Sequence, residues 1–112
     1  MQSKTELQKA VKNLLRRTPK GDYSEGPNGP IEEWDVFSVT DMSYMFNGAE
    51  VFNGDISNWD VSSVVSMSWM FHRADVFNSD LSDWDVSSLQ IMNQIFHRAG
   101  QFTSDLSDWN GF

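Results

Sequence analysis

Apolar residues recur along most of this chain with a period of 25 residues. The clearest set is Trp34, Trp59, Trp84 and Trp109, in which each tryptophan follows the previous one by 25 positions. Other apolar columns keep the same phase: Ile31, Ile56, Leu81 and Leu106; Val36, Val61 and Val86; Met42, Met67 and Met92; Phe46, Phe71 and Phe96; Phe52, Phe77 and Phe102. Such self-similarity is typical of repeat proteins, in which each repeat adds one layer to a shared core. We therefore expect the Met, Phe and Trp columns to lie inside.

Within each repeat, the pattern predicts two short elements. Residues 59–61 alternate in polarity with period two, which is typical of a short strand, and the apolar positions of 64–71 follow a helical spacing. Ser62-Ser63 forms the turn between them, and a loop through Phe77 returns the chain. We expect an α/β solenoid of about three 25-residue repeats, with parallel short strands roughly 4.8 Å apart and short helical turns.

The N-terminal segment predicts an amphipathic helix at residues 3–17. Ser3 and Glu6 fit a capping box, and the apolar positions recur at helical spacing: Leu7, Ala10, Val11, Leu14 and Leu15. A loop rich in proline and glycine follows at 18–30. We expect this helix to cap the first repeat; the alternative is a basic helix that lies on an anionic membrane.

The expected organisation is therefore a capping helix and loop at 1–30 and a repeat body at 31–112. The repeats start near residues 31, 56 and 81, with a partial fourth from 106. The last one departs from the pattern, because Asn110-Gly111-Phe112 stands where Asp-Val-Ser is expected. This fits a terminal cap or a cut in a longer array, and we favour the cut because a bare final strand leaves an unprotected edge.

The charge is strongly negative and unevenly distributed. The net charge is −8, yet residues 1–20 hold six basic residues against Glu6 alone, whereas the rest holds only Arg73 and Arg98 against 15 acids. This argues against nucleic acid as the main partner, because phosphate binding needs cations. The chain has no cysteine, so thiolate metal sites and disulfides are excluded. No apolar run approaches the roughly 18 residues of a membrane span, and the first 20 residues lack the apolar centre of a secretory signal.

Strand alternation predicts an acidic face. If Trp59 and Val61 point inward, Asn58 and Asp60 point outward. The outward columns are Glu33, Asn58, Asp83 and Asp108, and Asp35, Asp60, Asp85 and Asn110. Like charges about 4 Å apart repel by roughly 1 kcal/mol in water, so the face can recruit a basic protein segment or a divalent cation. The structural alternative is a solvated ladder whose aspartates bond local backbone amides. The candidate partner-binding residues are Glu33, Asp35, Asn58, Asp60, Asp83, Asp85 and Asp108.

Three other features have both structural and functional interpretations. Asp55, Asp80 and Asp105 predict Asx-type turns, with a cation as the alternative. His72-Arg73 and His97-Arg98 predict cations at helix ends, with pairing to Glu50 or Asp75, or zinc, as alternatives. The Trp column is expected inside, but four exposed indoles would form a strip for stacking a carbohydrate or peptide. We expect no cofactor, no metal site and no catalytic residues, because nearly every polar residue belongs to a repeating column.

The repeat Ile-Ser-Asn-Trp-Asp-Val-Ser-Ser-Val-x-x-Met-x-x-Met-Phe-x-x-Ala-x-x-Phe-Asn-x-Asp resembles the BspA-like leucine-rich-repeat family. It is most similar to the Trp-Asp-Val type found in bacterial lipoprotein-type and protist surface proteins. The resemblance covers residues 31–109, and residues 6–11 and 30–34 also look like the usual opening of that family. It implies a right-handed leucine-rich-repeat-like solenoid, a cell-surface or secreted location, a role in adhesion or protein interaction, and no enzyme activity.

The sequence thus predicts a non-enzymatic repeat module that binds a protein, possibly one with a basic surface, through an acidic sheet face. One alternative is self-association, in which the basic N-terminal helix of one copy meets the acidic body of the next. The other is a cation-binding surface module.

Overall fold

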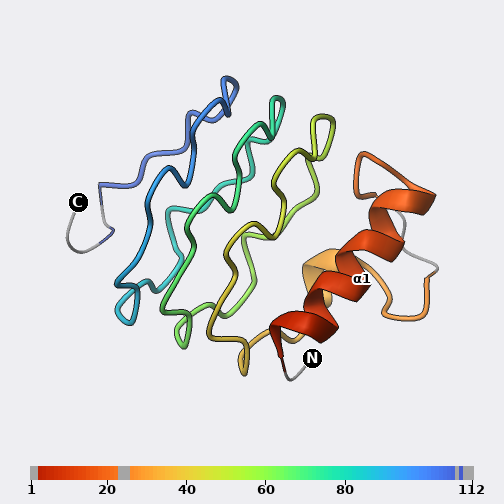
Figure 1. Ribbon diagram of the computed structural model, residues 1–112, viewed down its shortest axis with the longest axis horizontal. Helices are drawn as coiled ribbons and strands as arrows, with labels where there is room; N and C mark the ends of the chain where they lie inside the picture. The colour runs from red at the N-terminus through yellow and green to blue at the C-terminus, as the bar shows by residue number, and fades with distance from the viewer. Residues whose placement is uncertain (1–2, 23–25, 108, 110–112) are drawn as a thin grey trace.

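Successive 25-residue coils lie side by side along the molecule, and helix α1 packs across one end of them (Figure 1). The computed structural model describes residues 3–22, 26–107 and 109. Each coil reverses direction at two opposite ends of the molecule (Figure 1). Residues 25 positions apart therefore occupy equivalent places in neighbouring coils.

Helix α1 forms where the amphipathic pattern predicts it. It spans Lys4–Arg17, and the hydroxyl of Ser3 accepts a hydrogen bond from the N–H of Glu6 at 3.2 Å, as expected for an N-cap. Its apolar stripe is buried against the first coil: Leu7, Ala10, Val11 and Leu14. A membrane-bound helix would need this same face, so its burial removes the lipid-surface interpretation. The division of the chain at residue 30 stays a prediction.

Each coil is built from tight turns. In turns 56–59, 61–64, 67–70 and 71–74, the N–H of the fourth residue donates to the carbonyl of the first, and the same turns recur in the neighbouring coils. The one other helix in the described ranges is η1, a short 3-10 segment at Ile31–Glu33.

Neighbouring coils are joined by a regular set of backbone hydrogen bonds. The N–H groups of Met67, Trp69, Phe71 and Arg73 donate to the carbonyls of Ile91, Asn93, Ile95 and His97, at 2.8–3.0 Å. Met42, Tyr44, Phe46 and Gly48 bond in the same way to carbonyls 24 residues later. Between these positions, Met70, His72 and Ala74 bond within their own coil. Alternate amides thus hold the stack together, while the amides between them hold the turns.

The strands predicted from the period-two pattern do not form. Parallel pairing in the described residues is limited to two isolated bridges, of Asp41 with Ser66 and of Ser66 with Ile91, and these residues contain no sheet. Segment 59–61 is confined between two turns, and here a side chain makes the contact between coils. The indole N–H of Trp59 donates to the carbonyl of Ile31 at 2.8 Å.

The predicted helical turns are also wrong. Tyr44, Trp69 and Gln94 have φ values of 63°, 59° and 56°, in the left-handed region that interrupts an α-helix. No α-helical bonding forms in 67–74, because alternate amides bond to the next coil and the amides between them bond only three residues back. The apolar positions of 64–71 are nevertheless buried, because the turns bring Val64, Met67, Met70 and Phe71 to the interior.

The predicted core columns are confirmed, although Met92, Phe96 and Phe102 in the last complete coil are only partly buried. Phe46, Phe71 and Phe96 stack with ring centroids 5.5–5.7 Å apart, and Phe52, Phe77 and Phe102 stack at 5.7–6.0 Å. The residues of α1 and of the coils share one apolar cluster. The radius of gyration is 12.8 Å, close to the value of about 13 Å for a compact domain of this length. The expected α/β leucine-rich-repeat-like solenoid of parallel strands and helical turns is therefore wrong: the chain forms a compact body whose coils are built from turns, with one α-helix and no sheet in the described residues.

Candidate functional site

The predicted acidic face is a row of turns, because the described residues contain no sheet. Asp60 Oδ1 accepts hydrogen bonds from the N–H of Ser62 at 3.1 Å and from its hydroxyl at 2.6 Å. Asp85 Oδ1 accepts from the N–H of Ser87 at 2.9 Å, and Asp35 Oδ1 accepts from the N–H of Phe37 at 3.1 Å. These are Asx turns, in which a carboxylate holds the backbone two residues on. The interpretation in which these aspartates bond local amides is confirmed.

The remaining candidates of the first column are exposed beside these turns. Glu33 closes η1, and Asn58 and Asp83 each precede a buried tryptophan by one residue. Asp108 and Asn110 lie outside the described residues. We define the acidic row as the six described candidates: Glu33, Asp35, Asn58, Asp60, Asp83 and Asp85.

The second aspartate column forms Asx turns as predicted. Asp55, Asp80 and Asp105 accept from the N–H groups of Ser57, Ser82 and Ser107 at 2.9–3.0 Å. The serine hydroxyl bond and then the amide bond lower the pKa of Asp55, Asp80 and Asp85 below the ordinary value. For Asp105, the amide bond and then the hydroxyl bond have the same effect on the pKa. These carboxylates are therefore ionised and held in place by the turns.

Asp41 was not among the sequence candidates, and it joins the first coil to α1. Its Oδ1 accepts from the N–H of Ser43 at 2.8 Å, and its Oδ2 lies 3.4 Å from Lys4 Nζ. Burial raises the pKa of Asp41, but the bonds from Ser43 and the charge of Lys4 outweigh it, so the pKa lies below its ordinary value. The Asp-x-Ser spacing, shared with the second column, was the available signal.

The in-phase tryptophans are buried, so the surface stacking strip is wrong. Trp34, Trp59, Trp84 and Trp109 are 2–7% exposed. The indole N–H groups of Trp59, Trp84 and Trp109 donate to the carbonyls of Ile31, Ile56 and Leu81 at 2.8–3.0 Å. Each of these carbonyls lies 28 residues earlier, in the preceding coil. The indoles therefore act as structural bonds between coils.

A second set of side chains gathers on the surface. Tyr44 and Trp69 stack with centroids 6.4 Å apart, Trp69 meets the ring of His72 edge-on at 4.8 Å, and His72 stacks on His97 at 5.1 Å. With Arg73 and Arg98, these residues form what we call the ridge. Tyr44 and Trp69 were not among the candidates predicted from the sequence; the available signal was that Trp69 is out of phase with the other four tryptophans.

The ridge corrects the interpretation of the His-Arg pairs. They do not cap helices, because no helix of the described residues ends near 72–73 or 97–98. Nδ1 of His72 donates to Oδ1 of Asn47 at 2.8 Å, since a carbonyl oxygen only accepts. Burial, then the positive charges of His97, Arg73 and Arg98, lower the pKa of His72. Neither Arg73 nor Arg98 forms an ion pair with a described residue.

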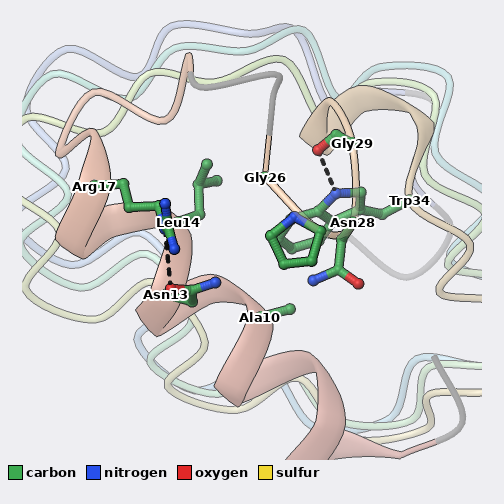
Figure 2. A pocket seen from close by; sticks show the side chains of 9 residues that line it. Ala10, Asn13, Leu14, Arg17, Gly26, Asn28, Gly29 and Trp34 are labelled. Carbon is green, nitrogen blue, oxygen red and sulfur yellow. Dashed lines mark hydrogen bonds between the residues drawn. The ribbon is translucent and has the colours of Figure 1, made fainter.

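The described surface has several hollows of about 230–410 Å³ that are open to solvent, and one much smaller cavity that lies against the buried Trp34. Figure 2 shows a cavity between α1 and the loop that leads to Trp34, whose indole donates to the carbonyl of Gly29 at 3.0 Å. Its volume is about 10 Å³, roughly the space of one water molecule. Among the described residues, no group of three or more His, Asp or Glu side chains could hold a metal ion.

The fold and its repeating contacts define a compact repeat protein of stacked 25-residue coils. A family model described as a Mycoplasma protein of unknown function, DUF285, matches residues 17–111, so the chain belongs to this family. Comparisons with curated proteins and with solved structures gave no match. The resemblance to the BspA-like family stays a prediction. Within the described ranges, no helix is both long and apolar enough to cross a membrane.

Proposed function

We propose that this chain is a non-enzymatic protein-interaction module that binds a basic segment of a partner protein along the acidic row. The observation that carries the proposal is the fixation of the carboxylates. Asp35, Asp60 and Asp85 each use Oδ1 to hold a turn. A charge that is already ordered loses little conformational entropy when a partner binds, so preorganised groups favour association.

The charge around the row also supports a basic partner. No lysine or arginine occurs in residues 31–72 or 74–97, and Asp60, Asp83 and Asp85 form no ion pair with any described residue. A surface lined by one sign of charge raises the local concentration of an oppositely charged partner and speeds its association. The row is thus arranged to attract cations while its own turns stay intact.

The test removes charge without removing the turns. Asp60→Asn and Asp85→Asn keep an Oδ1 acceptor for the Asx turn, and Asp83→Asn introduces the residue that stands at the equivalent position 58. The probe is a fluorescein-labelled peptide in which lysine alternates with alanine, titrated at about 50 mM salt, where charges more than roughly 14 Å apart are screened. We expect the triple variant to bind the peptide at least about tenfold more weakly than the wild type.

The matched control removes the same number of charges elsewhere, by Glu6→Gln, Glu50→Gln and Asp75→Asn. We expect this variant to keep most of the affinity. Equal weakening in the two triple variants would mean that the peptide senses net charge alone, and the acidic row would then have no specific role.

Self-association through α1 is a second candidate, and one observation favours it. The helix buries its apolar stripe in its own chain and leaves Lys9, Lys12 and Arg16 exposed at one end of the coils (Figure 1). Contact of this end with the acidic body of another copy would be head-to-tail. Sedimentation velocity tests it: assembly should occur at low salt, dissolve at high salt and disappear when these three residues become glutamine.

A further inference from the structure

We propose that the ridge of Tyr44, Trp69, His72, Arg73, His97 and Arg98 binds an acidic peptide segment of a partner protein. This surface is distinct from the acidic row and has the opposite charge preference, so the inference goes beyond the function proposed above. Contacts within the ridge are continuous: Tyr44 stacks on Trp69, Trp69 meets both imidazoles edge-on, and the imidazoles stack on each other.

The positive charge of the ridge is isolated in the sequence and unpaired among the described residues. Arg73 and Arg98 are the only lysine or arginine residues after position 20, in a segment that holds 15 carboxylates. Both are exposed, and neither forms an ion pair with a described residue. The planar guanidinium group has donors in a fork that matches a carboxylate, so two arginines one coil apart suit successive acidic side chains of an extended segment.

These arginines also have an unfavourable backbone conformation. Arg73 and Arg98 have φ values of 58° and 62°, whereas the equivalent position in the first coil is Gly48 with φ 75°. The left-handed region is unfavourable for every residue except glycine, and such strain is concentrated at functional sites. The coil accommodates glycine at this position, so the fold alone does not explain the choice of arginine.

The surface beside the arginines is rich in aromatic side chains. Tyr44 is 53% exposed and Trp69 is partly exposed, and both also have positive φ values. Tyrosine, tryptophan and arginine are the residues most enriched among the energetic centres of protein interfaces. Asn47 orients His72 through a 2.8 Å hydrogen bond, which fixes the ring between Trp69 and His97.

Two carboxylates lie near the ridge and oppose the binding of an acidic ligand. Glu50 and Asp75 each follow two residues after Gly48 and Arg73, are exposed, and form no ion pair with a described residue. They repel an acidic ligand without neutralising the arginines. Their removal should therefore strengthen binding.

The experiment uses a fluorescein-labelled peptide in which glutamate alternates with alanine, titrated with the whole 112-residue chain at about 50 mM salt. In Arg73→Gly with Arg98→Gly, both cations are lost but the left-handed backbone is relieved, so the fold is retained, which a thermal melt checks. We expect the affinity to fall at least about tenfold. Gly48→Arg adds a third cation where a new Cβ meets no atom within 4 Å, at the cost of the same left-handed strain that Arg73 and Arg98 already carry, and it should raise the affinity several-fold.

The control removes two cations from α1, by Lys9→Gln and Lys12→Gln, and should leave the affinity within about threefold. Glu50→Gln with Asp75→Asn should tighten binding. The proposal is overturned if the wild type does not bind the peptide, or if the α1 control weakens binding as much as the ridge variant. Tighter binding of a single-stranded oligonucleotide than of the peptide contradicts it as well. So does self-association that Arg73→Gly abolishes, because the occupant would then be a second copy.

Discussion

Replacing Trp84 with phenylalanine should destabilise the protein more than the same replacement at Trp69. Trp84 is 4% exposed, and its indole N–H donates to the carbonyl of Ile56 in the preceding coil at 3.0 Å. That carbonyl also accepts the N–H of Trp59, so the variant loses one of its two hydrogen bonds. The lost bond costs about 0.5–1.5 kcal/mol, and the smaller ring buries roughly 40 Å² less, which costs about 1 kcal/mol. The expected loss is therefore about 2 kcal/mol.

Trp69 is the matched control because it is partly exposed and its indole donates to no described residue. Because Trp69 is partly exposed, Trp69→Phe loses less buried area than Trp84→Phe and should cost less than about 1 kcal/mol. Urea denaturation followed by far-UV circular dichroism measures both losses without relying on tryptophan fluorescence. A loss of 2 kcal/mol should also lower the Tm by roughly 10 °C.

The two variants differ in the hydrogen bond between coils and in the buried area that is lost, so a cost of Trp84→Phe beyond the difference in burial measures the hydrogen bond. If Trp84→Phe costs no more than Trp69→Phe, the indole bonds do not stabilise the stack, and the structural role assigned to the tryptophan column is wrong.

Three further predictions concern the turns, the charges and one close contact. Asp60→Ala should cost about 1 kcal/mol in urea denaturation because the Asx turn is lost, whereas Asp60→Asn should be nearly neutral; equal effects would contradict the turn assignment. Stability should fall in two steps on acidification, monitored as Tm. The pKa of His72 lies below 6.5 in the folded state, so its contribution is lost as the pH falls below about 6.5 toward that folded pKa. The pKa values of Asp55, Asp80, Asp85 and Asp105 lie below 3.8, so the contribution of these aspartates to stability is lost below about pH 4. His72→Gln should abolish only the step that begins near pH 6.5. Gly54→Ala places a Cβ 2.7 Å from the buried ring of Phe52 and should cost about 1–3 kcal/mol. Gly100→Ala, whose Cβ meets nothing within 4 Å, should cost less than half of that in the same assay.

The apolar columns and α1 could be predicted because their signals are local or strictly periodic. Ser3 caps the helix at the predicted end, and columns such as Phe46, Phe71 and Phe96 stack in phase. The Asx turns of Asp55, Asp80 and Asp105 were also predicted, because the side chain of an aspartate in a loop readily accepts a hydrogen bond from the backbone N–H two residues later.

The strands and helical turns were predicted wrongly for a physical reason. The interior positions 64–71 have a helical spacing, but the backbone at Trp69 is left-handed and its amide bonds to the next coil. Tyrosine, tryptophan and glutamine at such positions have no recognisable propensity for that conformation, unlike glycine. The hydrogen bond from the Trp59 indole to the carbonyl of Ile31 could not be predicted either. A periodic tryptophan indicates that the ring is buried, but it does not indicate which group accepts the indole N–H.

The candidate site was predicted in part. The acidic residues are exposed as expected, but they lie on turns, and Asp60 and Asp85 have a structural role that the sequence offered only as an alternative. The ridge could not be predicted, because it joins residues from different coils whose types differ within each column. The sequence offered one indication of this surface, which is that Arg73 and Arg98 are isolated cations in an acidic segment.

Amide hydrogen exchange tests the central claim, that alternate amides of one coil bond to the next, most directly. Met67, Trp69, Phe71 and Arg73 donate to carbonyls of the following coil, whereas the equivalent Met92, Gln94, Phe96 and Arg98 donate to no carbonyl of a described residue. We predict strong protection of the first four amides and fast exchange of the second four. Similar exchange rates in the two sets would contradict the stacking of coils through these bonds.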